Sequence, residues 1–559
     1  MNNMKLLHNA RIHTLNPAQP TASAMLIGHS EILAIGGDEL LEARAEKINL
    51  GGRIILPGLT DAHIHLQYYS LGLQKIDCET TTLTECLGRV AERVKQTKPG
   101  EWVLGHGWNQ NEWENISPRR NEEREGKLTS RRKDESSRSS HLRGDSLWPN
   151  ASDLDAIAPN NPIYLTAKSL HAAWANTAAL KLAGITASTP DPENGSIQRD
   201  EYGQATGILL ETAMDLVSDK IPQPSLAAVM DSIRVAQPIL WKMGLTGVHD
   251  FDRRFCFMAL QELHKRGELK LRVTKSLPVE DLEHAAELGL RSGFGDDTLR
   301  IGMVKAFMDG ALGPHTAAMF APYLNEPDNR GILNMDGEHL FELARRASDT
   351  GLGMTVHAIG DRANHEVLDA YEQLRGYERE HGLPALRHRI EHVQVLHPND
   401  TARLAQLNVI ASMQPIHATS DMHAAEHFWG AERVPFAYAW RTQLNHGATL
   451  AFGSDAPVES PNPFLGIHAA VTRRRPDGSP NPEGWVPAQK LTRSEALAAY
   501  TLGPAFAAGQ ESKSGRLAPN HLADLIVLED DPFTCEADKF LSMQSSATMV
   551  GGEWVWSSL

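Results

Sequence analysis

An apolar run near the start of the chain ends in two histidines. The run LPGLTDAHIHL covers residues 56–66 and places His63 and His65 two positions apart. In a β-strand, such residues point to the same side, so the two imidazoles would share one face. Imidazole is a common nitrogen ligand for zinc and related ions. The spacing therefore predicts half of a metal coordination shell, with incidental histidines at an exposed strand end as the alternative for this motif alone.

Four further residues of ligand type lie in or just after apolar runs along the chain. They are Lys305 in IGMVKAFMDG, His357 in GMTVHAIGD, His392 in HRIEHVQVL and Asp455 in TLAFGSDAP. Each has an ordinary interpretation by itself: a buried core histidine, a lysine that reaches solvent along its stem, or a helix N-cap aspartate. Joint metal binding is the chemistry that all six residues could share, and it requires elements that bring them to one point.

Eight apolar or β-branched runs alternate with helix-like segments and could position these residues. Besides the run that contains His63, they lie at 245–251, 271–277, 301–310, 353–361, 388–396, 409–415 and 449–457. The segment GEHLFELARRASDT is typical of the helices between them. This alternation predicts an α/β fold, a (β/α)8 TIM barrel with a parallel sheet. Because active sites of such barrels form at the C-terminal ends of the strands, the six residues are predicted to cluster there.

The predicted barrel is interrupted in sequence. It takes residues 56–74 and 241–500, while strand-like pieces in 1–55 and 501–559 predict one small β-sandwich built from both chain ends. The gap at 75–240 is too long for a βα loop and predicts an inserted subdomain. Within it, 119–145 is rich in Ser and charge, which predicts a flexible surface loop. A nucleic-acid-binding tail is the weaker alternative, because acidic residues interleave with its arginines.

Composition excludes several functional classes. The 559 residues are 41% hydrophobic and 22% charged, which is ordinary for a globular chain of several domains. A formal charge of −16 disfavours nucleic acid and anionic membranes as partners and leaves a small-molecule substrate. The N-terminus lacks a signal peptide core and no run is long enough to span a membrane, so we expect a cytoplasmic protein. A homo-oligomer stays open.

The cysteines and the common catalytic motifs narrow the chemistry further. Four cysteines are scattered without a CxxC pair, so any metal would be held by histidine and carboxylate groups. No GxSxG elbow, GxxxxGK[ST] loop or helix-opening GxGxxG occurs in the sequence.

The motifs in their order resemble those of the amidohydrolase superfamily, and in particular the group that contains N-substituted formamide deformylases. The resemblance covers nearly the whole chain and is carried by PGLTDAHIHL, GHGWNQNEW, HAAWANTAAL, VKAFMDGALGPHTA, TVHAIGDRA, RIEHVQ, SMQPIH, FGSDAPV and GRLAPNHLADLIVLEDDPF. The chain departs from the family pattern in three places. The loop after Trp113 is longer, Ser169-Leu170 replaces the usual Asp-Gly before His171, and His315 stands where arginine is common.

The resemblance implies a centre of two divalent metal ions, with zinc expected. His63, His65 and Asp455 would hold one ion and His357 and His392 the other, while Lys305 would bridge both as a carbamate. A buried lysine near cations has a lowered pKa, which supplies the free amine that carbon dioxide needs. The ions would activate a water, and Asp455 would be the catalytic base that passes the proton to the leaving nitrogen.

Loops over the predicted site supply further candidates. The candidate substrate contacts are Trp108, Asn109, His171, His315, Gln414 and His417. Of these, Trp108 is favoured as a packing residue of the insertion.

The predicted function is hydrolysis of a non-peptide C–N bond, as in an N-substituted amide, a formamide or a cyclic amide. A lactone or phosphoester hydrolase, or a lyase or isomerase on the same centre, is the alternative, because fold does not fix reaction. A non-catalytic, metal-binding regulatory protein is a further alternative. Its usual sign would be a lost ligand or base, and the sequence keeps all six residues.

Overall fold

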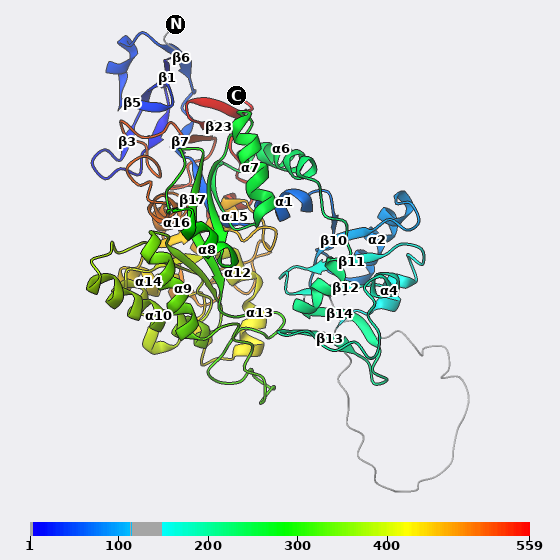
Figure 1. Ribbon diagram of the computed structural model, residues 1–559. Helices are drawn as coiled ribbons and strands as arrows, with labels where there is room; N and C mark the ends of the chain where they lie inside the picture. Colours follow the sequence, from blue (N-terminus) through cyan, green and yellow to red (C-terminus); the bar gives the residue numbers. More distant parts are fainter. Residues whose placement is uncertain (1–3, 112, 114–147) are drawn as a thin grey trace, which may run out of the picture. The chain divides into compact units, whose positions relative to one another are not determined.

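The chain folds into two compact units. The computed structural model describes residues 4–111, 113 and 148–559, so the predicted charged loop at 119–145 lies outside the described residues. One unit comprises Met1–Gln74 and Gln223–Leu559, and the other comprises Lys75–Pro222. The first unit holds an eight-stranded sheet and two smaller sheets, and the second holds one six-stranded sheet (Figure 1).

The eight-stranded sheet is a nearly closed parallel barrel, as the sequence predicts. Neighbouring strands pair in parallel in the order of the chain. A parallel bridge between Ile64 and Ala456 joins the end of the first strand to the segment after the last. The strands are β8 (Leu59–Ile64), β15 (Leu245–Asp250), β16 (Arg272–Pro278), β17 (Leu299–Phe307), β18 (Met354–Ala358), β19 (Arg389–His392), β20 (Ile410–Met413) and β21 (Leu450–Phe452). All eight predicted strand positions are confirmed.

Helices pack on the outside of this barrel and explain why its strands are apolar on both faces. Every residue of β15 and β18 is buried, which is the pattern of a parallel sheet covered by helices. The predicted helix GEHLFELARRASDT forms α9 (Gly337–Thr350), with Asp336 as its N-cap and Gly351 in the left-handed conformation at its end. The other helices are α1 (Leu66–Gly72), α6 (Leu226–Lys242), α7 (Arg254–Lys265), α8 (Leu282–Glu287), α10 (Asp361–Glu380), α11 (Arg403–Gln406), α12 (Pro415–Ser420), α13 (Met422–Ala424), α14 (Trp440–His446), α15 (Pro463–Thr472), α16 (Arg493–Ala499) and α17 (Leu502–Ala507).

Two boundaries differ from the sequence expectations. The run that contains His63 is divided at Gly58, because residues 54–57 form β7 (Ile54–Pro57) in another sheet. A side chain at Gly58 would lie 2.2 Å from Thr246 Oγ1, so only glycine allows this close approach. Helix α6 lies outside the unit formed by the insertion, which ends at Pro222, because its apolar face joins the core beneath the barrel helices.

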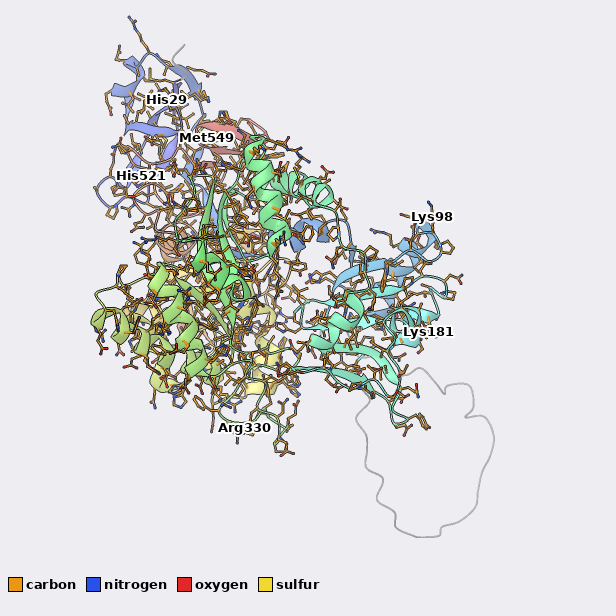
Figure 2. All side chains as sticks on the ribbon, in the orientation of Figure 1. His29, Lys98, Lys181, Arg330, His521 and Met549 are labelled. Carbon is orange, nitrogen blue, oxygen red and sulfur yellow. The ribbon has the colours of Figure 1, made fainter. Side chains whose placement is uncertain are left out.

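Two smaller sheets unite both ends of the chain. One has the order β5-β4-β1-β6 and the other β24-β23-β22-β7-β2-β3, and residues of both share a hydrophobic core. Met549, labelled in Figure 2, is fully buried in this core. The strands are β1 (Lys5–His8), β2 (Arg11–His13), β3 (Thr21–Ala22), β4 (Ala24–Gly28), β5 (Glu31–Gly36), β6 (Glu46–Asn49), β22 (Leu525–Leu528), β23 (Ala547–Val550) and β24 (Glu553–Ser557).

The second unit contains a mixed sheet of order β13-β14-β12-β11-β10-β9. Its strands are β9 (Ile76–Asp77), β10 (Val103–Trp108), β11 (Ile163–Ala167), β12 (Ala172–Ala175), β13 (Gly195–Arg199) and β14 (Ala205–Glu211), and its helices are α2 (Leu83–Gln96), α3 (Ala151–Asp155), α4 (Thr177–Leu182) and α5 (Asp215–Ser218). Across the described part of both units, no helix combines the length and apolarity needed to cross a membrane.

Candidate metal centre

The six residues predicted to bind metal lie at the C-terminal end of the barrel. His63 lies in β8 and His65 directly follows that strand, while Lys305, His357 and His392 lie in β17, β18 and β19, and Asp455 follows β21. All are buried except His65, which is partly buried. Residues far apart in sequence therefore reach one end of the barrel because parallel strands all end there.

His63, His65 and Asp455 form the tightest group. The Nε2 atoms of His63 and His65 lie 3.3 Å and 3.4 Å from Asp455 Oδ1. One ligand atom from each residue lies within 4.8 Å of the others, which is a spacing that a single metal ion could bridge.

The protonation of His63 shows that this group fits a cation. Burial and the nearby Lys305 lower the pKa of His63 to about 4, so its imidazole is neutral. Its Nδ1–H donates to Glu391 Oε2 at 2.6 Å, which leaves a lone pair on Nε2. That Nε2 is buried and makes no hydrogen bond to any described residue. Two acceptors, His63 Nε2 and the Asp455 carboxylate, thus face each other, and a metal ion between them would satisfy both.

Asp455 is a carboxylate in this environment. Burial alone would raise its pKa, but its interactions with His63, His65 and His392, including the hydrogen bond from His65, hold the pKa well below its usual range. For His65, burial alone would lower the pKa, but hydrogen bonds to Asp252 and Asp455 raise it to about 10. The Asp252 contact joins Oδ1 to His65 Nδ1 at 3.1 Å and directs Nε2 toward Asp455.

A second group contains His392, His417 and Asp455. One ligand atom of each lies within 4.8 Å of the others. His392 Nδ1 lies 2.9 Å from Gln414 Oε1 and 4.0 Å from Asp455 Oδ2. The His357 ring lies 4.6 Å from the His392 ring between centroids, and its Nε2 donates to the Gly310 carbonyl at 2.9 Å. The other ring nitrogen of His357 is Nδ1, which is also an atom of ligand type.

Lys305 lies between two aromatic rings. Its Nζ is 4.8 Å from the Phe251 ring centroid and 4.9 Å from that of Phe307. Among the described residues, no hydrogen bond to this amine is found. Burial lowers the pKa of Lys305 to about 8, although Glu391 and Asp455 oppose the shift. A lysine of this kind supplies a free amine more readily than a surface lysine.

Strained backbone fixes two of these side chains. His392 and Asp455 have φ of 77° and 60°, in the left-handed region that residues other than glycine rarely adopt. Val393 follows with φ of 44°, which is unusual for a β-branched residue. Such strain is found where the fold must aim a functional side chain. Asp61 supports the backbone beside Asp455, because its carboxylate accepts hydrogen bonds from the backbone N–H of His63 and Ser454 at 3.0 Å each.

Sequence reasoning missed the charged residues that orient the histidines. Glu391 holds His63 and pairs with Arg389 at 2.8 Å, and Asp252 holds His65. Behind Asp252, the buried Lys275 pairs with Asp250 at 2.9 Å. The available signal was the presence of charged residues inside the otherwise apolar runs HRIEHVQVL, GVHDFD and LRVTKSL. Carboxylates that hold the second nitrogen of a ligating histidine are a general feature of metal sites.

Three of the six predicted substrate contacts lie in the first unit. Gln414 and His417 lie beside His392, whereas His315 pairs with Glu326 at 2.6 Å and lies against Phe428. In the second unit, Trp108 is fully buried among other tryptophans and donates its indole N–H to Leu165 O.

Two further predicted contacts also lie in the second unit. Asn109 accepts a hydrogen bond from Asn111 N, and His171 Nδ1 lies 2.9 Å from Glu211 Oε2. Trp108, Asn109 and His171 thus all belong to the second unit.

Comparison with known proteins identifies the family of the chain. A profile described as the amidohydrolase family matches residues 46–123 and 145–556. The chain therefore belongs to the amidohydrolase family, and the resemblance inferred from its motifs is confirmed.

Individual relatives match along almost the whole chain. Protein LONG AFTER FAR-RED 3 of Arabidopsis thaliana is 32% identical over 99% of this chain and 91% of its own length. N-substituted formamide deformylase of Arthrobacter pascens is 28% identical over 98% of this chain and 97% of its own length. The crystal structure of an uncharacterized metal-dependent hydrolase from Pyrococcus horikoshii OT3 is 28% identical, with a TM-score of 0.75 over 96% of this chain and 99% of that one.

Proposed function

We propose that this chain is a metal-dependent hydrolase of a non-peptide C–N bond in a small molecule. The observation that carries the proposal is the pair of buried acceptors, His63 Nε2 and Asp455 Oδ1, which lie 3.3 Å apart. The relative named N-substituted formamide deformylase supports an amide-type substrate, such as an N-substituted amide, a formamide or a cyclic amide.

Two divalent ions, with zinc as the expected metal, would be held by the residues at the C-terminal end of the barrel. His63, His65 and Asp455 would bind one ion and His357 and His392 the second, and Lys305 would bridge them as a carbamate. When bound, such ions supply Lewis acidity, which lowers the pKa of a water and polarises a carbonyl oxygen.

The residues of the chain would direct the protons. Asp455, held as a carboxylate by its histidine neighbours, would accept a proton from the attacking water and return it to the leaving nitrogen. Glu391 and Asp252 would keep the Nδ1–H of His63 and His65 in place, so that both Nε2 atoms stay directed toward Asp455.

Gln414 and His417 would bind the substrate beside Asp455. The Nε2 atoms of both side chains are buried and make no hydrogen bond within the described part of the chain. His417 Nδ1 lies 3.3 Å from Gln394 Nε2 and accepts from it, so its Nε2 would carry the hydrogen and donate. Two such donors suit the oxygen of a carbonyl group. His315, Trp108, Asn109 and His171 stay proposed contacts of lower priority.

A substrate panel tests this function. Zinc-loaded protein should hydrolyse an N-substituted formamide or a cyclic amide, and Asp455→Asn should abolish turnover, whereas Asp538→Asn, which removes a surface carboxylate paired with Arg474, should not. Turnover of lactones or phosphoesters alone would overturn the amide assignment. A metal-loaded protein that is inactive on every substrate class would favour the non-catalytic alternative.

A further inference from the structure

A cavity of about 60 Å³ lies at the N-terminal end of the barrel, opposite the candidate metal centre. The starts of strands β8, β15, β16 and β17 line it, together with the segment that follows α17. A water molecule needs roughly 10–15 Å³ of such space, so this cavity has room for a small ion. The lining includes three arginines and two aspartates: Arg272, Arg300, Arg516, Asp297 and Asp524.

The two aspartates already have cationic partners. Arg272 forms a two-pronged pair with Asp524, Nε to Oδ2 and Nη2 to Oδ1 at 2.9 Å each. Asp297 accepts from Lys513 Nζ at 3.1 Å and 3.2 Å. Both acids that line the cavity are therefore paired with other cations, and no ion pair of Arg300 or Arg516 is found among the described residues.

Both remaining arginines have buried nitrogens without a partner. Arg300 donates from Nη2 to the Gly293 carbonyl at 3.0 Å, but its Nε and Nη1 make no hydrogen bond to the described residues. The Nε of Arg516 is also buried, and within the same part of the chain it has no hydrogen-bond partner. A buried donor without an acceptor is costly, more so for a charged group. Guanidinium groups stay charged in proteins, so neutralisation cannot remove the cost.

An anion would satisfy these groups in one step. Its oxygens would accept from three buried nitrogens, and its charge would balance two guanidinium groups in a forked, charge-assisted geometry. Thr60 and Thr274 also line the cavity and could add hydroxyl donors. The formal charge of the whole chain is −16, so a surplus of positive charge here is a local property of these residues.

We propose that this cavity binds a small tetrahedral oxyanion of the phosphate class between Arg300 and Arg516. The site lies at the opposite end of the barrel from the predicted metal ligands and does not rest on the proposed hydrolase function. The shared chemistry is a dianionic phosphate group, either as the free ion or as the head of a small phosphomonoester.

Calorimetric titration of the full chain with inorganic phosphate tests the proposal. Ionic strength is held constant with chloride, because surface ion pairs respond to salt in general. Wild-type protein should bind one equivalent, and Arg300→Gln and Arg516→Gln should each weaken binding roughly 10- to 100-fold, since each removes a charge-assisted donor. Arg345→Ala, which removes a surface charge from α9, is the matched control and should bind like wild type. Glycerol 3-phosphate in a parallel titration separates a phosphomonoester from the free ion.

Two results would overturn the site. One is an absence of phosphate binding beyond that of chloride at equal ionic strength. The other is phosphate binding that survives both glutamine substitutions, as binding at the metal centre would. If either glutamine variant fails to fold, Arg300→Lys and Arg516→Lys replace it. These substitutions keep the charge but lose the forked donor geometry of the guanidinium group. They should therefore weaken phosphate binding, but less than loss of the charge would.

Discussion

The two ends of the barrel present opposite chemistry. At the C-terminal end, buried acceptors face each other, as His63 Nε2 faces Asp455 Oδ1 at 3.3 Å. At the N-terminal end, buried donors of Arg300 and Arg516 have no acceptor among the residues that the structure describes. Because a buried acceptor without a donor favours a cation and a buried donor without an acceptor favours an anion, we expect sites of opposite preference at the two ends. Buried atoms without hydrogen-bond partners can therefore be used to predict, separately for each end, whether a ligand is a cation or an anion.

The largest expected effect concerns Lys305. Lys305→Ala should lose at least one metal equivalent and more than about 10⁴-fold in kcat, which exceeds the effect of one general acid or base. Metal analysis by mass spectrometry and steady-state kinetics measure both. Lys305→Glu, or acetate added to the alanine variant, should restore part of the metal content because each supplies a bridging carboxylate. An alanine variant with two tightly bound metals and near-native turnover would rule out the bridge.

Lys275 provides the contrast on the neighbouring strand. Its ammonium pairs with Asp250 at 2.9 Å and donates to the carbonyls of Asp252 and Ser276. Lys275→Met should leave Asp250 as an unpaired buried charge and lower the free energy of unfolding by about 3–5 kcal/mol. Denaturant unfolding measures this loss. Lys305→Met should cost the metal-free protein much less, because no hydrogen bond to Lys305 is found in the described chain. Equal losses in the two variants would contradict this distinction.

The carboxylates paired with arginine allow a matched test of the two ends. Glu391 pairs with Arg389 near the metal centre, and Asp524 pairs with Arg272 at the cavity. Glu391→Gln should weaken metal binding about 10- to 100-fold, because His63 loses its orienting carboxylate. Asp524→Asn removes the same kind of pair and should leave metal affinity unchanged. Chelator competition measures both affinities, and an equal loss in both variants would indicate general destabilisation.

Much of this fold could be predicted from the sequence, since buried parallel strands appear in it as apolar runs with metal-binding types of residue at their C-terminal ends. The same rule placed His357 and Asp455 at the C-terminal end of the barrel, where the structure has them. The partners of these residues could not be predicted in this way. Glu391 and His63 lie 328 positions apart, and no local pattern links them.

The remaining differences have similar causes. The apolar face of α6 could cover the barrel or the insertion equally well, so its unit became clear only from packing. The left-handed backbone at His392 has no glycine to indicate it. The cavity that contains Arg300 and Arg516 is lined by β17 and by a segment more than two hundred positions later, and no sequence motif indicates that these lie together.

The smallest expected effect sharpens the comparison at the N-terminal end. Within the described part of the chain Arg300 forms no ion pair, so Arg300→Gln should change the free energy of unfolding by no more than about 1 kcal/mol. With phosphate at ten times its dissociation constant, wild-type protein should gain about 1.4 kcal/mol, because a ligand that binds only the folded state stabilises it by mass action. The glutamine variant should gain almost none. Metal content and turnover should stay within about twofold of wild type, since the substitution lies at the far end of the barrel from the predicted ligands. Unfolding curves with phosphate or chloride at equal ionic strength measure the stability difference. A phosphate-dependent gain that is equal in both proteins would place the anion elsewhere and remove the contrast between the two ends.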